Sequence, residues 1–136
     1  MKAMLREAVD ELRQIENDPS NIRLFADPTE DEQLLAVNND PMSIQYIKKP
    51  LPVVMERAIE LNPMSIQHFI TSASTEIRFL AIQKNPCVIQ FYTNSSYEEQ
   101  KLAMSLEEET FNLIPNRTER TSLYYILLYF KALFLP

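Results

Sequence analysis

The sequence predicts an all-α protein, a right-handed or irregular α-solenoid of short helical hairpins with atypical capping helices at both ends. Four prolines recur at steps of 22, 22 and 23 residues, each preceded by Asn or Asp: Pro19, Pro41, Pro63 and Pro86. Two more columns keep this register, an apolar one at Ile22, Ile44, Ile66, Ile89 and Phe111 and a small one at Ala36, Ala58, Ala81 and Ala103. Such a period is typical of stacked repeats that bury their apolar faces against their neighbours.

The first element is an amphipathic helix over residues 2–16. Its apolar positions follow helical spacing: Met4, Leu5, Ala8, Val9, Leu12 and Ile15. Its exit, Asn17-Asp18-Pro19, repeats the triplet Asn39-Asp40-Pro41 that separates later repeats. We therefore assign residues 1–17 to a helix that caps the N-terminal end of the stack.

Residues 18–116 hold the repeats, and each begins with a short first helix after Asn-Pro or Asp-Pro. At Asn62-Pro63 the Asn side chain can accept a hydrogen bond from a free helix amide, and Pro fits the first helical position. This first helix is predicted to last about two turns and to end near Thr71. A second helix follows from near Ser74 to Lys84. Such short connections predict antiparallel helical hairpins.

The second helices carry their own start signals. Thr29 with Glu32, and Ser96 with Glu99, match the capping box, in which side chain and backbone cap each other. Leu51 takes the cap position in another repeat, where the prolines on either side of it enforce the turn instead. The alanine column lies mid-helix, where a small side chain lets a neighbouring helix approach closely.

Residues 117–136 form an apolar C-terminal helix, with Thr118 at the cap position. One set of apolar residues is expected to face the stack: Leu123, Ile126, Leu127, Phe130, Leu133 and Phe134. A second set is left for an interface with a second copy or another protein: Tyr124, Tyr125, Leu128, Tyr129 and Leu135. By length, residues 1–136 are predicted to form a single domain.

Composition excludes several classes of function. The 136 residues include no Gly, one Cys and one His, and the formal net charge is −6. Without Gly no phosphate-cradling or dinucleotide loop can form, and with one Cys and one His no usual structural zinc site is available. We expect no cofactor, no metal and no enzyme activity, and we interpret Cys87 and His68 as packing residues rather than a catalytic pair. No secretory signal is evident, so a cytoplasmic location without a membrane is expected.

Two surface columns on the first helices are candidate binding features. The polar column reads Arg23, Gln45, Gln67, Gln90 and Asn112. Its amides could face a ligand, or they could bond neighbouring helix ends and hold the register, and we favour the second interpretation. The other column pairs Met42 with Tyr46, Met64 with His68, and Cys87 with Phe91, either packed between repeats or exposed. The partner-binding candidates are therefore Met42, Gln45, Tyr46, Met64, Gln67, His68, Gln90, Phe91, Tyr124, Leu128 and Tyr129.

Charge bears on the choice of partner. The net charge disfavours nucleic acid, which normally calls for a basic stripe. The acidic clusters at residues 30–32, 98–99 and 107–109 coincide with helix starts, where the helix dipole favours them. A negative surface for a basic partner is the alternative interpretation.

The repeats Asn62–Gln67 and Asn85–Gln90, each after a helix with Ala-Ile, resemble short repeats of about 22 residues in uncharacterised bacteriophage and bacterial proteins. The resemblance covers about residues 18–116, and the general shape is similar to HEAT-like arrays with longer repeats. It implies architecture and a phage origin but no catalytic residues. We predict a noncatalytic protein-binding module, a modulator or inhibitor of a host defence or nucleic-acid-handling protein in the host cytoplasm. The alternatives are a nucleic-acid reader that uses the Gln column and a structural self-associating protein.

Overall fold

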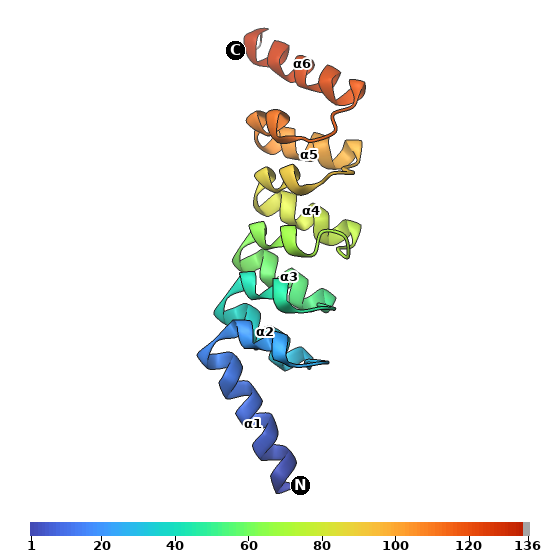
Figure 1. Cartoon of the computed structure of the whole chain (residues 1–136). Coiled ribbons are helices and arrows are strands. Elements are labelled where there is room, and N and C mark those ends of the chain that lie inside the picture. The colour runs from blue at the N-terminus through green and yellow to red at the C-terminus, as the bar shows by residue number, and fades with distance from the viewer. Residues whose placement is uncertain (135–136) are drawn as a thin grey trace. The chain divides into compact units, whose positions relative to one another are not determined.

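A computed structural model describes residues 1–134 of the chain, and all regular structure in this range is helical (Figure 1). The α-helices are α1 (Lys2–Asn17), α2 (Glu30–Asn39), α3 (Pro52–Leu61), α4 (Thr75–Lys84), α5 (Tyr97–Leu106) and α6 (Glu119–Phe134). Between them lie the 3-10 helices η1 (Pro19–Leu24), η2 (Pro41–Tyr46), η3 (Pro63–His68), η4 (Pro86–Phe91) and η5 (Glu108–Leu113). The prediction of an all-α protein with a repeating helical pattern is confirmed.

The first helix of each repeat is a six-residue 3-10 helix, which makes the predicted two turns, but η3 ends at His68 and not near Thr71. In η3 the amide of Ser65 donates to the carbonyl of Asn62, which is the i to i+3 bond of a 3-10 turn. Such a helix has three residues per turn, so residues four apart do not share a face. The predicted pairs four apart, such as Met42 with Tyr46, therefore do not form one stripe.

The predicted caps are present. Asp18, Asp40, Asn62 and Asn85 each accept a hydrogen bond from the backbone amide two residues later. Both capping boxes form, at Thr29 and at Ser96, while Leu51 makes no side-chain cap bond. Helix boundaries in this chain are thus set by local hydrogen bonds that satisfy the first free amides.

The structure divides into two compact units, of which the first is Met1–Ala73. In this unit α2 packs against α1 and α3, and η2 packs against η1 and η3. Its core includes Ile15, Ile22, Ala36, Val37, Ile44, Val54, Ala58, Ile59 and Ile66. Ala36 and Ala58 are fully buried, as expected for small residues at a close helix contact.

The second unit is Ser74–Pro136, described as far as Phe134. Here α5 packs against α4, η4, η5 and α6. Its core includes Ile77, Ala81, Ile82, Val88, Ile89, Tyr92, Ala103, Met104 and Ile114. The same α and 3-10 alternation thus builds both units, and the single domain stays a prediction.

Helix α1 spans the predicted residues, but only its C-terminal part is covered. Ile15 is buried and Leu12 is half-buried, whereas Met4, Leu5 and Val9 are exposed. The predicted capping role is therefore met by the last turns of α1 alone, where the helix contacts α2 and η1.

Candidate protein-binding site

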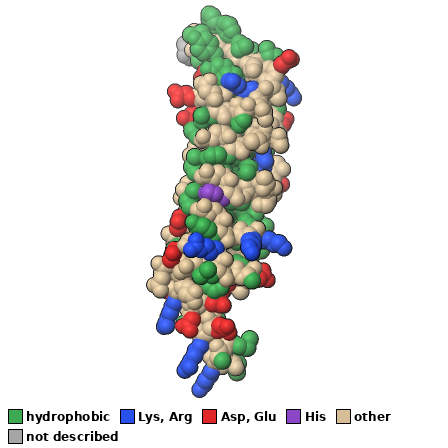
Figure 2. Space-filling model, in the orientation of Figure 1, with side chains coloured by type: hydrophobic (Ala, Val, Ile, Leu, Met, Phe, Trp, Pro, Cys, Tyr) green, Lys and Arg blue, Asp and Glu red, His purple; other side chains and the backbone are tan. Residues whose placement is uncertain are grey.

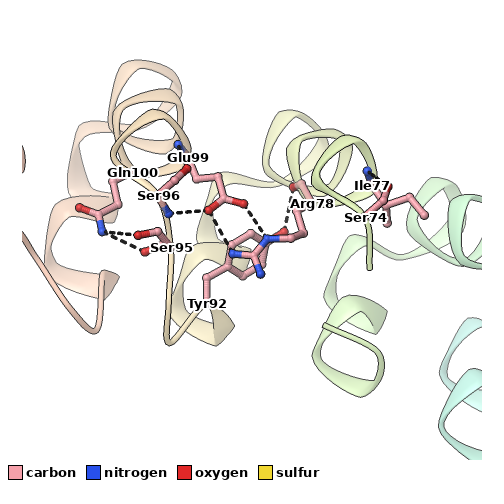
Figure 3. A network of polar contacts seen from close by, with 8 residues as sticks. All are labelled: Ser74, Ile77, Arg78, Tyr92, Ser95, Ser96, Glu99 and Gln100. Carbon is pink, nitrogen blue, oxygen red and sulfur yellow. Dashed lines mark hydrogen bonds and ion pairs between the residues drawn. The ribbon is translucent and has the colours of Figure 1, made fainter. Parts of the chain in front are cut away.

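The start of α5 is fixed by a buried ion pair (Figure 3). Glu99 accepts from the Ser96 amide at 2.7 Å, from Arg78 Nε at 2.6 Å and from Arg78 Nη2 at 3.0 Å. The guanidinium also lies 4.6 Å from the centre of the Tyr92 ring, and the Tyr92 hydroxyl donates to the Arg78 carbonyl at 2.8 Å. These bonds join α4, α5 and the residue after η4 into one rigid block.

The electrostatics of this block are those of a structural pair. Burial acts to raise the pKa of Glu99, but the hydrogen bonds from Arg78 and Ser96 outweigh it and leave that pKa lowered. The hydrogen bond with Glu99 raises the pKa of Arg78 despite partial burial. Burial raises the pKa of the Tyr92 hydroxyl. All three groups therefore keep one protonation state near neutral pH, so none is poised to transfer protons.

Gln100 ties α6 to this block. Its Nε2 donates to the carbonyls of Ser95 at 3.2 Å and Asn116 at 3.1 Å, and its Oε1 accepts from the Thr121 hydroxyl. Thr121 is fully buried, and its amide donates to the Thr118 hydroxyl at 3.1 Å. The face of α6 that carries Thr121 must therefore point at α5.

Sequence reasoning missed this role of the glutamine. In both units a Gln stands directly after the capping-box Glu, as Thr-x-x-Glu-Gln and as Ser-x-x-Glu-Gln. Gln33, the counterpart of Gln100, is also buried and also bridges two turns, to Pro28 and to Leu51. The repeated Glu-Gln pair was the signal that could have revealed it.

The inward face of α6 follows from Thr121 by helical spacing. Tyr124, Tyr125 and Leu128 lie three, four and seven residues further on, and all three are half-buried. Tyr125 stacks on Phe111 with the ring centres 4.0 Å apart, and the Tyr124 ring lies under the Lys101 ammonium group at 5.5 Å. These residues hold α6 against α5 and η5.

The opposite face of α6 is apolar and exposed. This outward stripe consists of Leu123, Ile126, Leu127, Phe130, Leu133 and Phe134, with exposed fractions from 46% to 75%. Figure 2 shows hydrophobic side chains gathered over this end of the chain. Because so many large apolar side chains are exposed on one helix, this face is a candidate association surface.

The predicted assignment of the two faces was therefore wrong. The six residues expected to face the stack are the outward stripe, while Tyr124 and Leu128 of the predicted interface point inward. Tyr129 is exposed as expected, and Leu135 lies outside the described residues. The Thr118 cap and the bond between Thr121 and Gln100 set this rotation, because a buried hydroxyl must find its partner.

The Gln side chains of the polar column make different hydrogen bonds from those predicted. Gln45, Gln67 and Gln90 are exposed. Each Nε2 donates to the carbonyl three residues earlier in its own 3-10 helix, at 3.0, 3.1 and 3.0 Å. The favoured interpretation, bonding between repeats, is thus wrong for these amides, because residues three apart lie one above the other in a 3-10 turn.

The other candidates on the 3-10 helices are half-buried or exposed, and none belongs to the core. Met42, Tyr46, Met64 and Phe91 are half-buried, and His68 is exposed. One thioether does join two repeats, because Asn62 Nδ2 donates to the sulfur of Met42 at 3.7 Å. These residues support packing between repeats more than they offer a continuous surface.

Cys87 has the environment of a packing residue. Its thiol donates to Glu107 Oε2 at 3.6 Å, and burial, followed by the charge of Glu107, raises its pKa. A nucleophilic thiol needs a lowered pKa, which is the opposite shift.

Within residues 1–134 no group of His, Cys, Asp and Glu side chains is arranged to hold a metal ion. No helix in that range is long and apolar enough to cross a membrane.

Comparison with known proteins yields no match: no protein-family model, no curated protein and no solved structure matches the chain. The resemblance to phage and bacterial repeats therefore rests on the sequence motifs alone.

Proposed function

We propose that this chain is a noncatalytic helical-repeat protein-binding module, and that the outward stripe of α6 is its binding surface. The repeated α and 3-10 hairpins in each unit support assigning the chain to the α-solenoids, right-handed or irregular. The observation that carries the function is the stripe itself. Six large apolar side chains share one exposed helix face although the other face of the helix is already packed.

The occupant that fits the stripe is the stripe of a second copy. Leu123, Ile126, Phe130 and Leu133 recur at steps of three and four, the seam spacing of a coiled coil. The only charged residue between 122 and 134 is Lys131. An uncharged seam can meet its own copy about a two-fold axis without placing like charges opposite each other.

The area is adequate for a stable dimer. The six residues expose about half to three quarters of their surfaces. Together they offer on the order of 600 Å² per copy, close to the ~800 Å² per partner of a standard interface. Because each copy carries a net charge of −6, salt should strengthen the dimer by screening the repulsion between the two copies.

The test is the oligomeric state in solution. Sedimentation velocity and light scattering of the wild type should give a dimer that tightens with added salt. Leu127→Glu and Phe130→Glu should each give a monomer with unchanged helicity, since both side chains are exposed. Leu106→Glu is the matched control, because Leu106 is an exposed leucine on α5 outside the stripe. A wild type that stays monomeric to about 1 mM, a concentration that would reveal even very weak dimers, would refute the second copy as occupant.

Two functions expected from the sequence, modulation of a host protein and the alternative of a nucleic-acid reader, carry less support. Modulation of a host protein is a prediction that the resemblance alone makes. A nucleic-acid reader would use Gln45, Gln67 and Gln90, but the amide nitrogen of each already donates within its own turn. Each amide keeps one N–H and its oxygen for a ligand, but these neutral groups do not supply the basic stripe that a nucleic-acid backbone normally calls for.

A further inference from the structure

A cleft of about 410 Å³ lies in the first unit, between the turn that follows η1 and the turn that follows η2. Its charged and aromatic lining consists of Arg23, Phe25, Asp27, Tyr46, Lys48 and Lys49. The volume falls in the range of pockets that bind small ligands or a few residues of a peptide.

One buried side chain in the lining bonds both of the turns that border the cleft. Gln33, on α2, donates from Nε2 to the Pro28 carbonyl at 3.0 Å and accepts from the Leu51 amide at 3.1 Å. One amide group thereby fixes the ends of both turns, so the lining is positioned before any ligand arrives. Because Gln33 is buried with both its oxygen and its nitrogen bonded, it forms a fixed base for this cleft.

The charge of the cleft is opposite to that of its unit. Residues 1–73 contain 12 Asp and Glu against 7 Lys and Arg. Arg23, Lys48 and Lys49 nevertheless converge on the cleft, with Asp27 as the only acidic residue in its lining. Arg23 stands where η2, η3 and η4 have Gln, so it departs from the repeat pattern at this place. Its guanidinium lies 5.9 Å from the centre of the Tyr46 ring, which orients it.

The backbone supplies further donors. The amides of Ala26, Asp27, Lys48 and Lys49 make no hydrogen bond to any described residue. In the second unit the comparable pair of turns is tied together, because Asn116 Nδ2 donates to the Thr93 carbonyl. Between the two turns that border the cleft, no equivalent of this hydrogen bond is present among the described residues. A lysine of the lining stands at the position equivalent to Asn116.

We propose that this cleft binds an acidic peptide, an extended segment of a partner protein that carries Asp or Glu. The guanidinium fork matches a carboxylate, the two lysines add point charges, and the free amides can donate to peptide or side-chain oxygens. The half-buried Phe25 and Tyr46 offer an apolar wall for a neighbouring side chain. A nucleic acid fits less well, because three cations on a chain of net charge −6 do not make a basic stripe. This site is separate from the α6 stripe and does not depend on the function proposed above.

An NMR titration of the ¹⁵N-labelled full chain tests the proposal. The probe is an acetylated, amidated peptide of four glutamates and one tyrosine, and the same peptide with glutamines is the uncharged comparison. We expect saturable shifts confined to residues 23–28 and 46–51, weakening as salt is added. The glutamine peptide should cause none.

Two charge-matched triple variants give the specificity. Arg23→Gln, Lys48→Gln and Lys49→Gln together should weaken binding about tenfold or more, because they remove the cations that meet the carboxylates. Lys2→Gln, Arg6→Gln and Arg13→Gln together change the net charge equally on the exposed part of α1 and should leave binding within about twofold of the wild type. The proposal is overturned if the glutamate peptide causes no saturable shifts, if both variants lose binding equally, or if a thymidine octanucleotide binds the cleft more tightly than the peptide.

Discussion

Replacing the buried pair of Arg78 and Glu99 by apolar residues gives the sharpest test of how the second unit is held together. The replacements are chosen from another repeat. In α3, Met55 stands at the position equivalent to Arg78, and Val54 stands at the position equivalent to Glu99. Arg78→Met, Glu99→Val and the double variant therefore place residues that this helical pattern already accommodates.

The expected loss of unfolding free energy follows from the contacts that Glu99 makes. Glu99 is 3% exposed and accepts three charge-assisted bonds, two of them from Arg78. Breaking a buried pair by removing one partner costs about 3 to 5 kcal/mol. Because the Arg78 side chain keeps 20% exposure, we place each single variant at the lower end, about 3 kcal/mol or roughly 10 °C in Tm. The double variant leaves no unpaired charge and should lose at least about 1.5 kcal/mol less than the sum of the singles.

Chemical denaturation followed by circular dichroism measures these differences, and its pH dependence supplies an independent check. The folded pKa of Glu99 lies below the ordinary value of 4.5. Its stabilisation is therefore present above that ordinary value and is lost as the pH falls through the folded pKa. Acid should destabilise the wild type more than Arg78→Met. Two results would contradict a stabilising role for this pair. One is a double variant whose loss of unfolding free energy equals the sum of the two single losses, and the other is an acid response of Arg78→Met equal to that of the wild type.

Three further variants test the packing of the repeats by thermal and chemical denaturation. Ala81→Leu should cost about 1 to 3 kcal/mol by overpacking a fully buried position, and an unchanged melt would show that the alanine column is no packing seam. Ser65→Ala should stabilise the first unit by about 1 kcal/mol, because the buried hydroxyl has no hydrogen-bond partner among residues 1–134, and a clear loss would reveal one. Gln100→Leu should cost about 1 to 3 kcal/mol, because it removes a donor to the buried turn at the Asn116 carbonyl and one of the two partners of the Thr121 hydroxyl; equal stability would mean that α6 is held by its aromatic contacts alone.

The starts and caps of the helices were predictable from the sequence because they depend on bonds that span two to four residues. Asn62, Thr29 with Glu32, and Ser96 with Glu99 all cap the helices that their motifs indicated. The repeat period also predicted which columns are buried, except that Phe111 in the last repeat is only half-buried. The 3-10 form of the short helices was missed, since the Asn-Pro start suits an α-turn and a 3-10 turn equally.

The surfaces were decided by tertiary contacts between residues far apart in the chain. Both faces of α6 are apolar, so hydrophobicity could not say which one turns inward. The inward face is the one whose residues find partners far away in the chain: Thr121 bonds Gln100, 21 residues away, and Tyr125 stacks on Phe111. Likewise the cleft lies between two turns that Gln33 bonds, one of them 18 residues further along the chain. Local hydrogen bonds fix where a helix begins and ends, whereas the direction in which its side chains point is fixed by partners that only the folded chain brings within reach.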